Sequence, residues 1–239
     1  MEVPTEDKGF LPQEHRSRIL GLAAMVFLIL GSYAIARPAT ESLFVERHGA
    51  EALPKAWLLV AFASVVLVSA YSHWAARIDL VQAFGRVSAL SAVCLSVLLL
   101  ALELDIVGAR YALFAWKDIY IVMLVEIFWS FANQVVPIKK ARWLYGFFLV
   151  VGGLGGMLGN LLGGELATHV GTRSVLVVVI PVLIIPALGC LWMRRRPALS
   201  VARLSAKSQT GLAEGFQLLF RSRVLLLLMA LIALTQIVI

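Results

Sequence analysis

The segment Gly146–Leu166, GFFLVVGGLGGMLGNLLGGEL, decides the fold class. It lies in the uncharged run Trp143–Gly164, which can cross a bilayer as an α-helix, because about 20 apolar residues span the hydrocarbon core. Its glycines recur four residues apart, at Gly155, Gly159 and Gly163. That spacing puts them on one helix face and allows close approach of a second backbone. We expect a membrane helix whose glycine face packs against a neighbouring helix.

Similar apolar runs occupy most of the chain on both sides of this segment. Of its 239 residues, 61% are hydrophobic and 15% charged, which is more apolar surface than a soluble domain of this length can bury. The other runs are Ile19–Ala36, Ala56–Ala76, Val87–Leu102, Ile119–Val136 (apolar apart from Glu126), Ser174–Met193 and Val224–Ile239. The sequence therefore predicts an all-α polytopic membrane protein with six spanning helices and the start of a seventh.

The basic residues predict the orientation of these helices. Fifteen of the 21 Lys and Arg residues fall in segments on the side of the N-terminus, and six fall on the other side. Basic residues concentrate in cytoplasmic loops, so we expect a cytoplasmic N-terminus, in a protein of the bacterial inner membrane. The net charge of +7 then reflects topology and not nucleic-acid binding. The expected parts are a tail (1–17), a six-helix bundle (18–193), a basic cytoplasmic loop (194–223) and a truncated seventh helix (224–239).

A polar stripe interrupts the fourth apolar run. Asp118, Glu126, Ser130 and Asn133 are spaced so that they share one helix face, with Glu126 near mid-membrane. A carboxylate there is unfavourable by several kcal/mol unless it is paired, hydrated or protonated. We expect Glu126 to face the interior of the bundle and to take part in transport. The alternative is a structural ion pair, with Arg37 as the candidate partner.

The end of the first apolar helix carries a second polar face. Tyr33, Arg37 and Glu41 are spaced four residues apart and share that face. Pro38 frees a backbone carbonyl and bends the helix beside Arg37. These residues are candidates for binding a solute, with Arg37 meeting an anionic group. The alternative is that Arg37 and Glu41 only extend to the outer membrane surface, as charged residues at helix ends do.

The glycine pattern resembles a motif of the major facilitator superfamily. Gly146, Gly155, Gly159 and Gly163 are spaced as in the helix 5 signature of its antiporters, with Asn160 where that signature has proline. This resemblance implies the N-terminal six-helix half of a transporter built from two such halves.

The connection between the second and third runs resembles another motif of the same superfamily. Its sequence is HWAARIDLVQAFGRVSAL (73–90), in which Arg77, Asp79, Gly85 and Arg86 look like a stretched form of the charged loop that holds the inner gate. The resemblance implies a gating role for Arg77, Asp79 and Arg86. The alternative is an ordinary short cytoplasmic loop, which commonly holds a few arginines.

Two further stretches resemble the ATP/ADP translocase family of plastids and intracellular bacteria, together with its bacterial relatives. They are RPATESLFVERHGAEALPKAWLLVA after the first helix and FWSFANQVVPIKKARWLYGFF at the fourth, and EGFQLLFRSRVLLLLMALIAL resembles the entry to that family's seventh helix. The positions that match the family are Arg37, Pro38, Glu41, Asn133, Arg142 and Tyr145. Thr40 stands where the family has a lysine thought to meet phosphate. The resemblance implies nucleotide exchange as one form of transport.

The sequence thus favours a secondary active transporter that moves a small anionic solute by alternating access. The substrate-binding candidates are Tyr33, Arg37, Glu41, Glu126, Ser130 and Asn133. Two alternatives stay open: a proton-coupled carrier of an unrelated substrate, and a non-transporting membrane subunit or assembly factor of the same fold. The expected partners are the bilayer, the solute, and a C-terminal six-helix half or a second chain.

Enzyme chemistry, cofactors and metals are not expected. The chain lacks the GxxxxGK[ST], HExxH and GxSxG motifs. Cys94 and Cys190 lie in separate apolar runs without metal-ligand spacing, so they read as small core residues.

Overall fold

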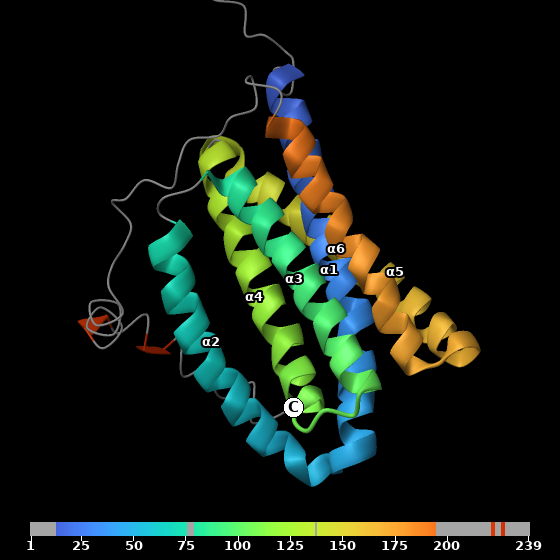
Figure 1. Ribbon diagram of the computed structural model, residues 1–239. Helices are drawn as coiled ribbons and strands as arrows, with labels where there is room; N and C mark the ends of the chain where they lie inside the picture. Colours follow the sequence, from blue (N-terminus) through green and yellow to red (C-terminus); the bar gives the residue numbers. More distant parts are fainter. Residues whose placement is uncertain (1–12, 76–78, 137, 195–220, 223–225, 228–239) are drawn as a thin grey trace, which may run out of the picture.

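The computed structural model describes residues 13–75, 79–136, 138–194, 221–222 and 226–227. In the main described part the chain forms six long α-helices and one short 3-10 helix (Figure 1). Their bounds are α1 Gln13–His48, η1 Ala50–Ala52, α2 Leu53–Ala75, α3 Leu80–Glu103, α4 Ala109–Val135, α5 Ile138–Val170 and α6 Thr172–Arg194. Each predicted spanning run up to Met193 lies in one of these helices, except for the last residue of two runs, Ala76 and Val136. The predicted tail 1–17 is too long by five residues, because α1 already begins at Gln13. Residues 1–12, most of the basic loop 194–223 and most of the run 224–239 lie outside the described residues.

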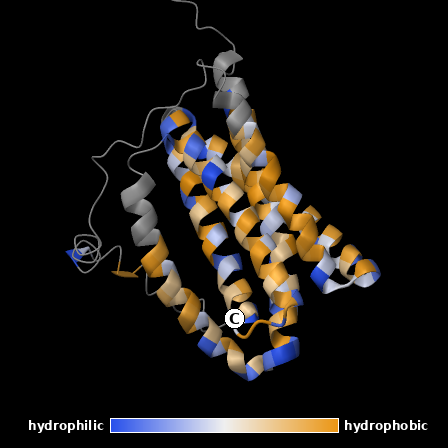
Figure 2. Cartoon of the chain, viewed as in Figure 1, coloured by the Kyte–Doolittle hydropathy of each residue, from blue (hydrophilic) through white to orange (hydrophobic). Residues whose placement is uncertain are grey.

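The apolar runs set the lengths of the helices. Among the described residues, five helices are long and apolar enough to cross a membrane, namely those over Arg18–His48, Ala50–Leu67, Leu80–Glu103, Lys140–Val170 and Thr172–Cys190. Figure 2 shows hydrophobic residues along these helices and hydrophilic ones mainly at their ends. The remaining helix, α4, is 27 residues long and carries charged residues within its length. Within the described residues, the prediction of α-helices long and apolar enough to span a membrane is therefore confirmed for five of the six, and α4 is not among these five.

Three tight connections lie at one end of the bundle, which we call the glycine end. They follow α1, α3 and α5, and contain Gly49, Gly108 and Gly171, whose φ values are 76°, 87° and 84°. Glycine adopts this left-handed conformation without the steric penalty of a Cβ atom. Helices α2 and α4 end, and α3 and α5 begin, at the opposite end of the bundle. We call it the basic end, because Lys139, Lys140 and Arg142 lie near the start of α5.

Helices α1 and α4 hold the bundle together. α1 packs against α4, α5 and α6, and α4 also packs against α2 and α3. The outer contacts are between α3 and α6 and between α5 and α6. In Figure 1, α2 lies at the edge of the bundle, beside α4 and away from α1 and α6. The polar residues of α1 and α4 are thereby brought to one shared interface.

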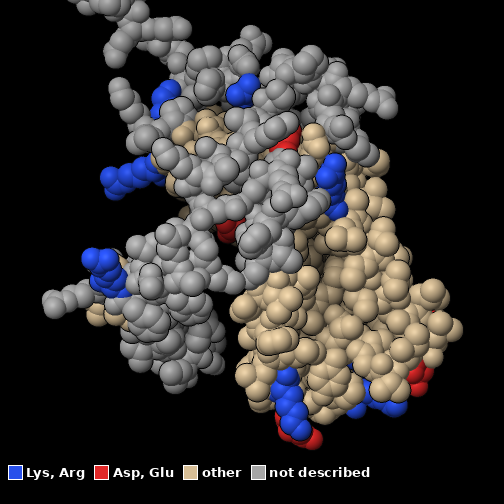
Figure 3. Space-filling model, turned by 60° about the vertical axis from the view of Figure 1, so that its left-hand side comes forward, with Lys and Arg blue, Asp and Glu red and all other residues tan. Residues whose placement is uncertain are grey.

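The outer surface of the bundle is broadly apolar. Large hydrophobic side chains of α2, α3 and α5 are exposed, among them Phe62, Leu90, Val97, Leu154 and Leu161. In Figure 3, an uncharged area covers the middle of the described surface, and Lys, Arg, Asp and Glu side chains lie below it and in the upper part of the view. Exposed apolar patches of this extent are unusual in soluble monomers and are solvated by a bilayer.

One predicted connection is shorter than expected. The charged stretch after α2 was predicted to continue through Gly85 and Arg86, but α3 begins at Leu80, so both residues are helical. Val81, Phe84 and Val87 are buried at helical spacing, which explains why the helix starts early. Gly85 is also buried, and a Cβ atom there would lie 2.9 Å from Cβ of Cys190 on α6. Gly85 therefore serves helix packing and not a loop.

Candidate functional site

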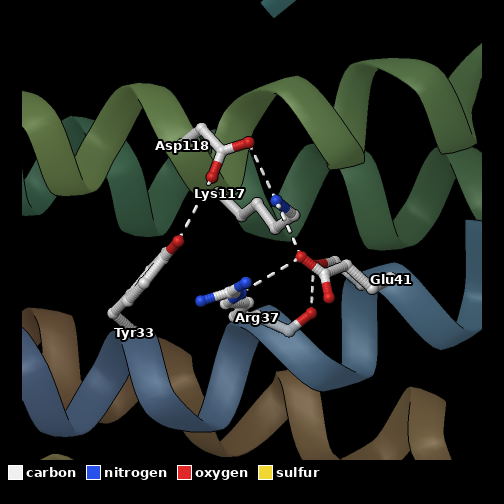
Figure 4. Close-up of polar contacts among 6 residues, drawn as sticks. Tyr33, Arg37, Glu41, Lys117 and Asp118 are labelled. Atoms are coloured by element: carbon white, nitrogen blue, oxygen red, sulfur yellow. Dashed lines mark hydrogen bonds and ion pairs between the residues drawn. The ribbon is translucent and has the colours of Figure 1, made fainter. Parts of the chain in front are cut away.

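A group of five polar side chains joins α1 to α4, and we call it the α1–α4 charge cluster (Figure 4). Its members are Tyr33, Arg37 and Glu41 of α1 and Lys117 and Asp118 of α4. Lys117 Nζ lies 2.8 Å from Asp118 Oδ2 and 3.3 Å from Glu41 Oε1. Arg37 Nε donates to the same Glu41 oxygen at 3.2 Å, and Tyr33 Oη donates to Asp118 Oδ1 at 3.3 Å. Two cations and two carboxylates thus form one continuous, charge-balanced network.

The helical spacing of α1 explains why its three members point the same way. Tyr33, Arg37 and Glu41 lie one turn apart, and α1 continues as a helix through Pro38. Proline has no N–H, so the carbonyl of Ala34 loses its usual helical hydrogen bond. Close by, the hydroxyl of Thr40 donates to the carbonyl of Arg37 at 2.9 Å. The sequence correctly placed these residues on one face, and the structure directs that face toward α4.

Lys117 is the most buried member of the cluster. Its side chain is 2% exposed, whereas that of Arg37 is 59% exposed. The Lys117 ammonium also lies 4.2 Å from the ring centre of Phe114, a favourable cation–π distance. Phe114 packs in turn against Phe44 of α1 and Ala56 of α2. A charged lysine so deep in the protein requires a carboxylate partner, since burying an unpaired ammonium is strongly unfavourable, and Lys117 has two of them.

Sequence reasoning missed Lys117. In the charge distribution it is only one of the six basic residues on the side opposite the N-terminus, directly before the apolar run Ile119–Val136. A signal was present, because Lys117 and Asp118 are adjacent and are flanked by Trp116 and Ile119. An adjacent opposite-charge pair inside an apolar helix is expensive in a membrane unless it has partners.

The expectation that Glu126 faces the interior of the bundle is wrong. Its side chain is exposed, and it has no hydrogen bond or ion pair with any residue that the structure describes. Lys117 and Glu126 are separated by about two and a half turns at 3.6 residues per turn, so they occupy opposite faces of α4. The proposed pairing of Glu126 with Arg37 is likewise not formed, because Arg37 pairs with Glu41.

Glu126, Ser130 and Asn133 form a polar stripe on the surface of α4, which we call the α4 stripe. Ser130 is half-buried, and Asn133 is exposed. The hydroxyl of Tyr145, on α5, donates to Oδ1 of Asn133 at 2.6 Å. With its oxygen so engaged, the Asn133 amide presents its N–H groups as donors. The stripe thus offers one carboxylate and one amide donor on an exposed face of α4.

The glycine face of α5 packs against α1, as predicted. A Cβ atom at Gly155 would overlap the carbonyl oxygen of Phe27, and one at Gly159 would overlap that of Gly31. At Gly163 it would lie 3.4 Å from Cα of Ile35. The two backbones therefore meet directly along three turns, which only glycine permits at the first two positions.

The predicted gating residues that the structure describes do not lie in one loop. Arg77 lies outside the described residues, Asp79 precedes the first residue of α3, and Arg86 lies on an exposed face within that helix. Asp79 and Arg86 both have interactions in the structure. Their gating role stays a prediction.

No group of three or more His, Cys, Asp or Glu residues could hold a metal ion in the part of the chain that the structure describes. No protein-family model matches the chain, and neither a curated protein nor a solved structure matches it. Its relation to any transporter family therefore depends on the residues and packing described above.

Proposed function

We propose that this bundle is one half of a secondary active transporter of the major facilitator type. It moves a small anionic solute by alternating access, and nucleotide exchange is one form that this transport takes. The solute binds between this half and a second six-helix half, supplied by the same polypeptide or by a second chain. The protein resides in the bacterial inner membrane with its basic end in the cytoplasm, in keeping with the distribution of Lys and Arg.

The observation that carries this proposal is a symmetry in the helix packing. The first three helices correspond to the last three: α1 to α4, α2 to α5 and α3 to α6. The contact of α1 with α5 therefore has the contact of α4 with α2 as its counterpart, and both are present. The contact of α1 with α6 becomes that of α4 with α3, again present, and those of α1 with α4 and of α3 with α6 map onto themselves.

The two halves of this symmetry run in opposite directions. α1 ends at the glycine end, where α4 begins. Within the described residues, α5 packs against α6 more closely than α2 packs against α3, and this is where the symmetry is incomplete. Inverted three-helix repeats with equivalent helices at the centre are the building plan of each half of a major facilitator transporter.

The exposed polar residues of α1 and α4 support a solute pathway along these central helices. Only one of the five N–H donors of Arg37, that of Nε, is engaged by Glu41, so its other donors can meet an anionic solute. Asn133 offers amide donors, and Glu126 balances charge or carries a coupling proton. A bare carboxylate facing lipid would be unfavourable by about 3 kcal/mol, so water or the second half must cover Glu126.

Uptake into liposomes tests this function. The purified protein would be reconstituted with an inside store of unlabelled anion and supplied with labelled ATP, phosphate or succinate. We expect saturable uptake of at least one anion, lost in Glu126→Gln and retained in Glu103→Gln. Glu103 is a matched control because it is also an exposed carboxylate, paired with Arg173 at 2.8 Å between α3 and α6.

If liposomes that hold the unlabelled anion inside take up none of the labelled anions, the result would count against anion transport. Uptake by Glu126→Gln at the wild-type rate, at every pH, would remove Glu126 from the mechanism. Uptake of a neutral or cationic solute that varies with the pH gradient would favour the proton-coupled alternative, for which the exposed carboxylate of Glu126 is the supporting observation.

A further inference from the structure

One oxygen atom lies between two cations at the interface of α1 and α4. Oε1 of Glu41 is 3.2 Å from Nε of Arg37 and 3.3 Å from Nζ of Lys117. Figure 4 shows both contacts converging on this atom from different helices. Carboxylate and phosphate oxygens are the usual partners of such paired cations. The position of Glu41 Oε1 is therefore already suited to an oxygen of an anionic solute.

The burial of the three residues shows how a solute could reach this position. Arg37 is exposed, Glu41 has a side chain that is 36% exposed, and Lys117 is buried. Glu41 is thus the partner of Lys117 that is more open to the surface, because the side chain of Asp118 is 23% exposed. Rotation of the Glu41 side chain away from the cluster would uncover Lys117 without moving either helix.

The charges of the cluster make this exchange feasible. Lys117 keeps its shorter contact, 2.8 Å to Asp118, when Glu41 leaves. These two residues are adjacent on α4, so the buried ammonium never loses its last partner. An anion that replaces Glu41 restores the balance of two positive and two negative charges, whereas an empty position would leave one charge in excess.

We propose that Lys117 is a solute-binding residue and that the Glu41 carboxylate occupies the site of the solute's anionic group. The inference rests on the proposed function and deepens it by assigning a carboxylate- or phosphate-bearing solute to a defined position. Binding then releases Glu41 of α1 from Lys117 of α4. The segment of α1 after Pro38 loses its ion pair to α4 at the moment the solute arrives, which couples binding to helix movement.

Anion binding by the purified full chain in detergent tests this assignment. Inorganic phosphate and acetate would be the probes, each titrated at constant ionic strength against chloride. Thermal stability would be the readout, because a ligand that binds the folded state raises its stability by an amount that grows with the ratio of ligand concentration to Kd. Glu41→Gln keeps the shape of the side chain and removes the internal competitor. We expect it to bind at least one probe about tenfold more tightly than the wild type.

A charge-matched variant identifies the binding residue. Glu41→Gln combined with Lys117→Met leaves Arg37 and Asp118 in balance and should lose the tightened binding. Glu103→Gln frees Arg173 from its carboxylate elsewhere at the glycine end and should bind as the wild type does.

Three results would overturn the proposal: equal affinity in Glu41→Gln and the wild type, tight binding retained in the double variant, or the same gain in Glu103→Gln. Preference for phosphate or for acetate would distinguish the two anion classes. Tightened binding without any uptake by liposomes would uphold this site and contradict transport. Anion uptake by liposomes, with the same binding affinity in Glu41→Gln and the wild type, would uphold transport and contradict this site.

Discussion

The central helix α1 meets its two main neighbours through contacts of opposite kinds. Against α5 it presents backbone: the carbonyl groups of Phe27 and Gly31 meet Gly155 and Gly159 with no side chain between them. Against α4 it presents long polar side chains, which join Lys117 and Asp118 in the charge cluster. The interface of α1 with α5 is formed by direct backbone contact, whereas that of α1 with α4 is formed by ion pairs that can exchange partners.

This difference suggests which contact stays fixed during transport. Close backbone packing tolerates almost no displacement, because interiors are packed as tightly as organic crystals. Ion pairs such as that of Arg37 and Glu41, which are partly exposed, are individually weak and can be broken at little cost. We therefore expect α1 and α5 to move as one body, while the contact between α1 and α4 rearranges.

The largest effect is expected at Lys117, and it would show how much the polar interface contributes to stability. Lys117→Met leaves Glu41 and Asp118 facing each other without the cation, so we expect a loss of about 3 kcal/mol in the free energy of unfolding. Denaturant unfolding in detergent measures it. The double variant Lys117→Met, Asp118→Asn should be less unstable than the sum of the single changes, and strict additivity would mean that the pair is not coupled.

The next effect concerns the backbone interface between α1 and α5. Gly159→Ala should destabilise the protein by about 2 kcal/mol, because the new Cβ overlaps the carbonyl of Gly31 and approaches Ala34 to 3.0 Å. The matched control is Gly156→Ala, where a Cβ would meet nothing within 4 Å. There we expect a gain of about 0.5 kcal/mol, since alanine is the better helix former. A change in stability of the same sign in both variants would contradict the claim that only one face of α5 packs directly against the backbone of α1.

The smallest effects are expected at the rim of the charge cluster. Tyr33→Phe removes one hydrogen bond to Asp118, and we expect a loss of about 1 kcal/mol in thermal or denaturant unfolding. Arg37→Gln breaks an exposed pair and should change stability by about 0.5 kcal/mol or less. A loss at Arg37 larger than that at Tyr33 would mean that Glu41 is held mainly by Arg37, which would weaken the contrast with Lys117.

The sequence predicts the helices and the close packing of the glycine face of α5, because both depend on local patterns. Uncharged runs such as Ser174–Met193 need no partner to be recognised as spanning segments. The glycines at Gly155, Gly159 and Gly163 indicate close packing against a neighbour, although not which helix that neighbour is. The start of α3 was placed too late, because a charged stretch was taken for a longer loop.

The site was harder to predict because it depends on the directions of helix faces. The spacing of Glu126, Ser130 and Asn133 shows that they share a face, but a helix can be rotated about its axis without changing that spacing. Packing against α1, α2 and α3 fixes the rotation of α4, and it buries Lys117 while exposing Glu126. Only contacts between helices, which a single sequence does not contain, decide between those two outcomes.

The central claim is that the α4 stripe faces a water-filled solute pathway and not lipid. Cysteine accessibility tests it most directly, in a protein whose Cys94 and Cys190 have been replaced by alanine. Single cysteines would be placed at Glu126, at Asn133 and, as a control, at Val97, which is exposed on α3. Each would then be treated in membranes with a charged, water-soluble thiol reagent.

We expect rapid modification at positions 126 and 133, slowed by a transported anion, and little at position 97, because a charged reagent reacts only where water reaches the thiol. Equal, slow reaction at all three positions would place Glu126 against lipid and contradict the account.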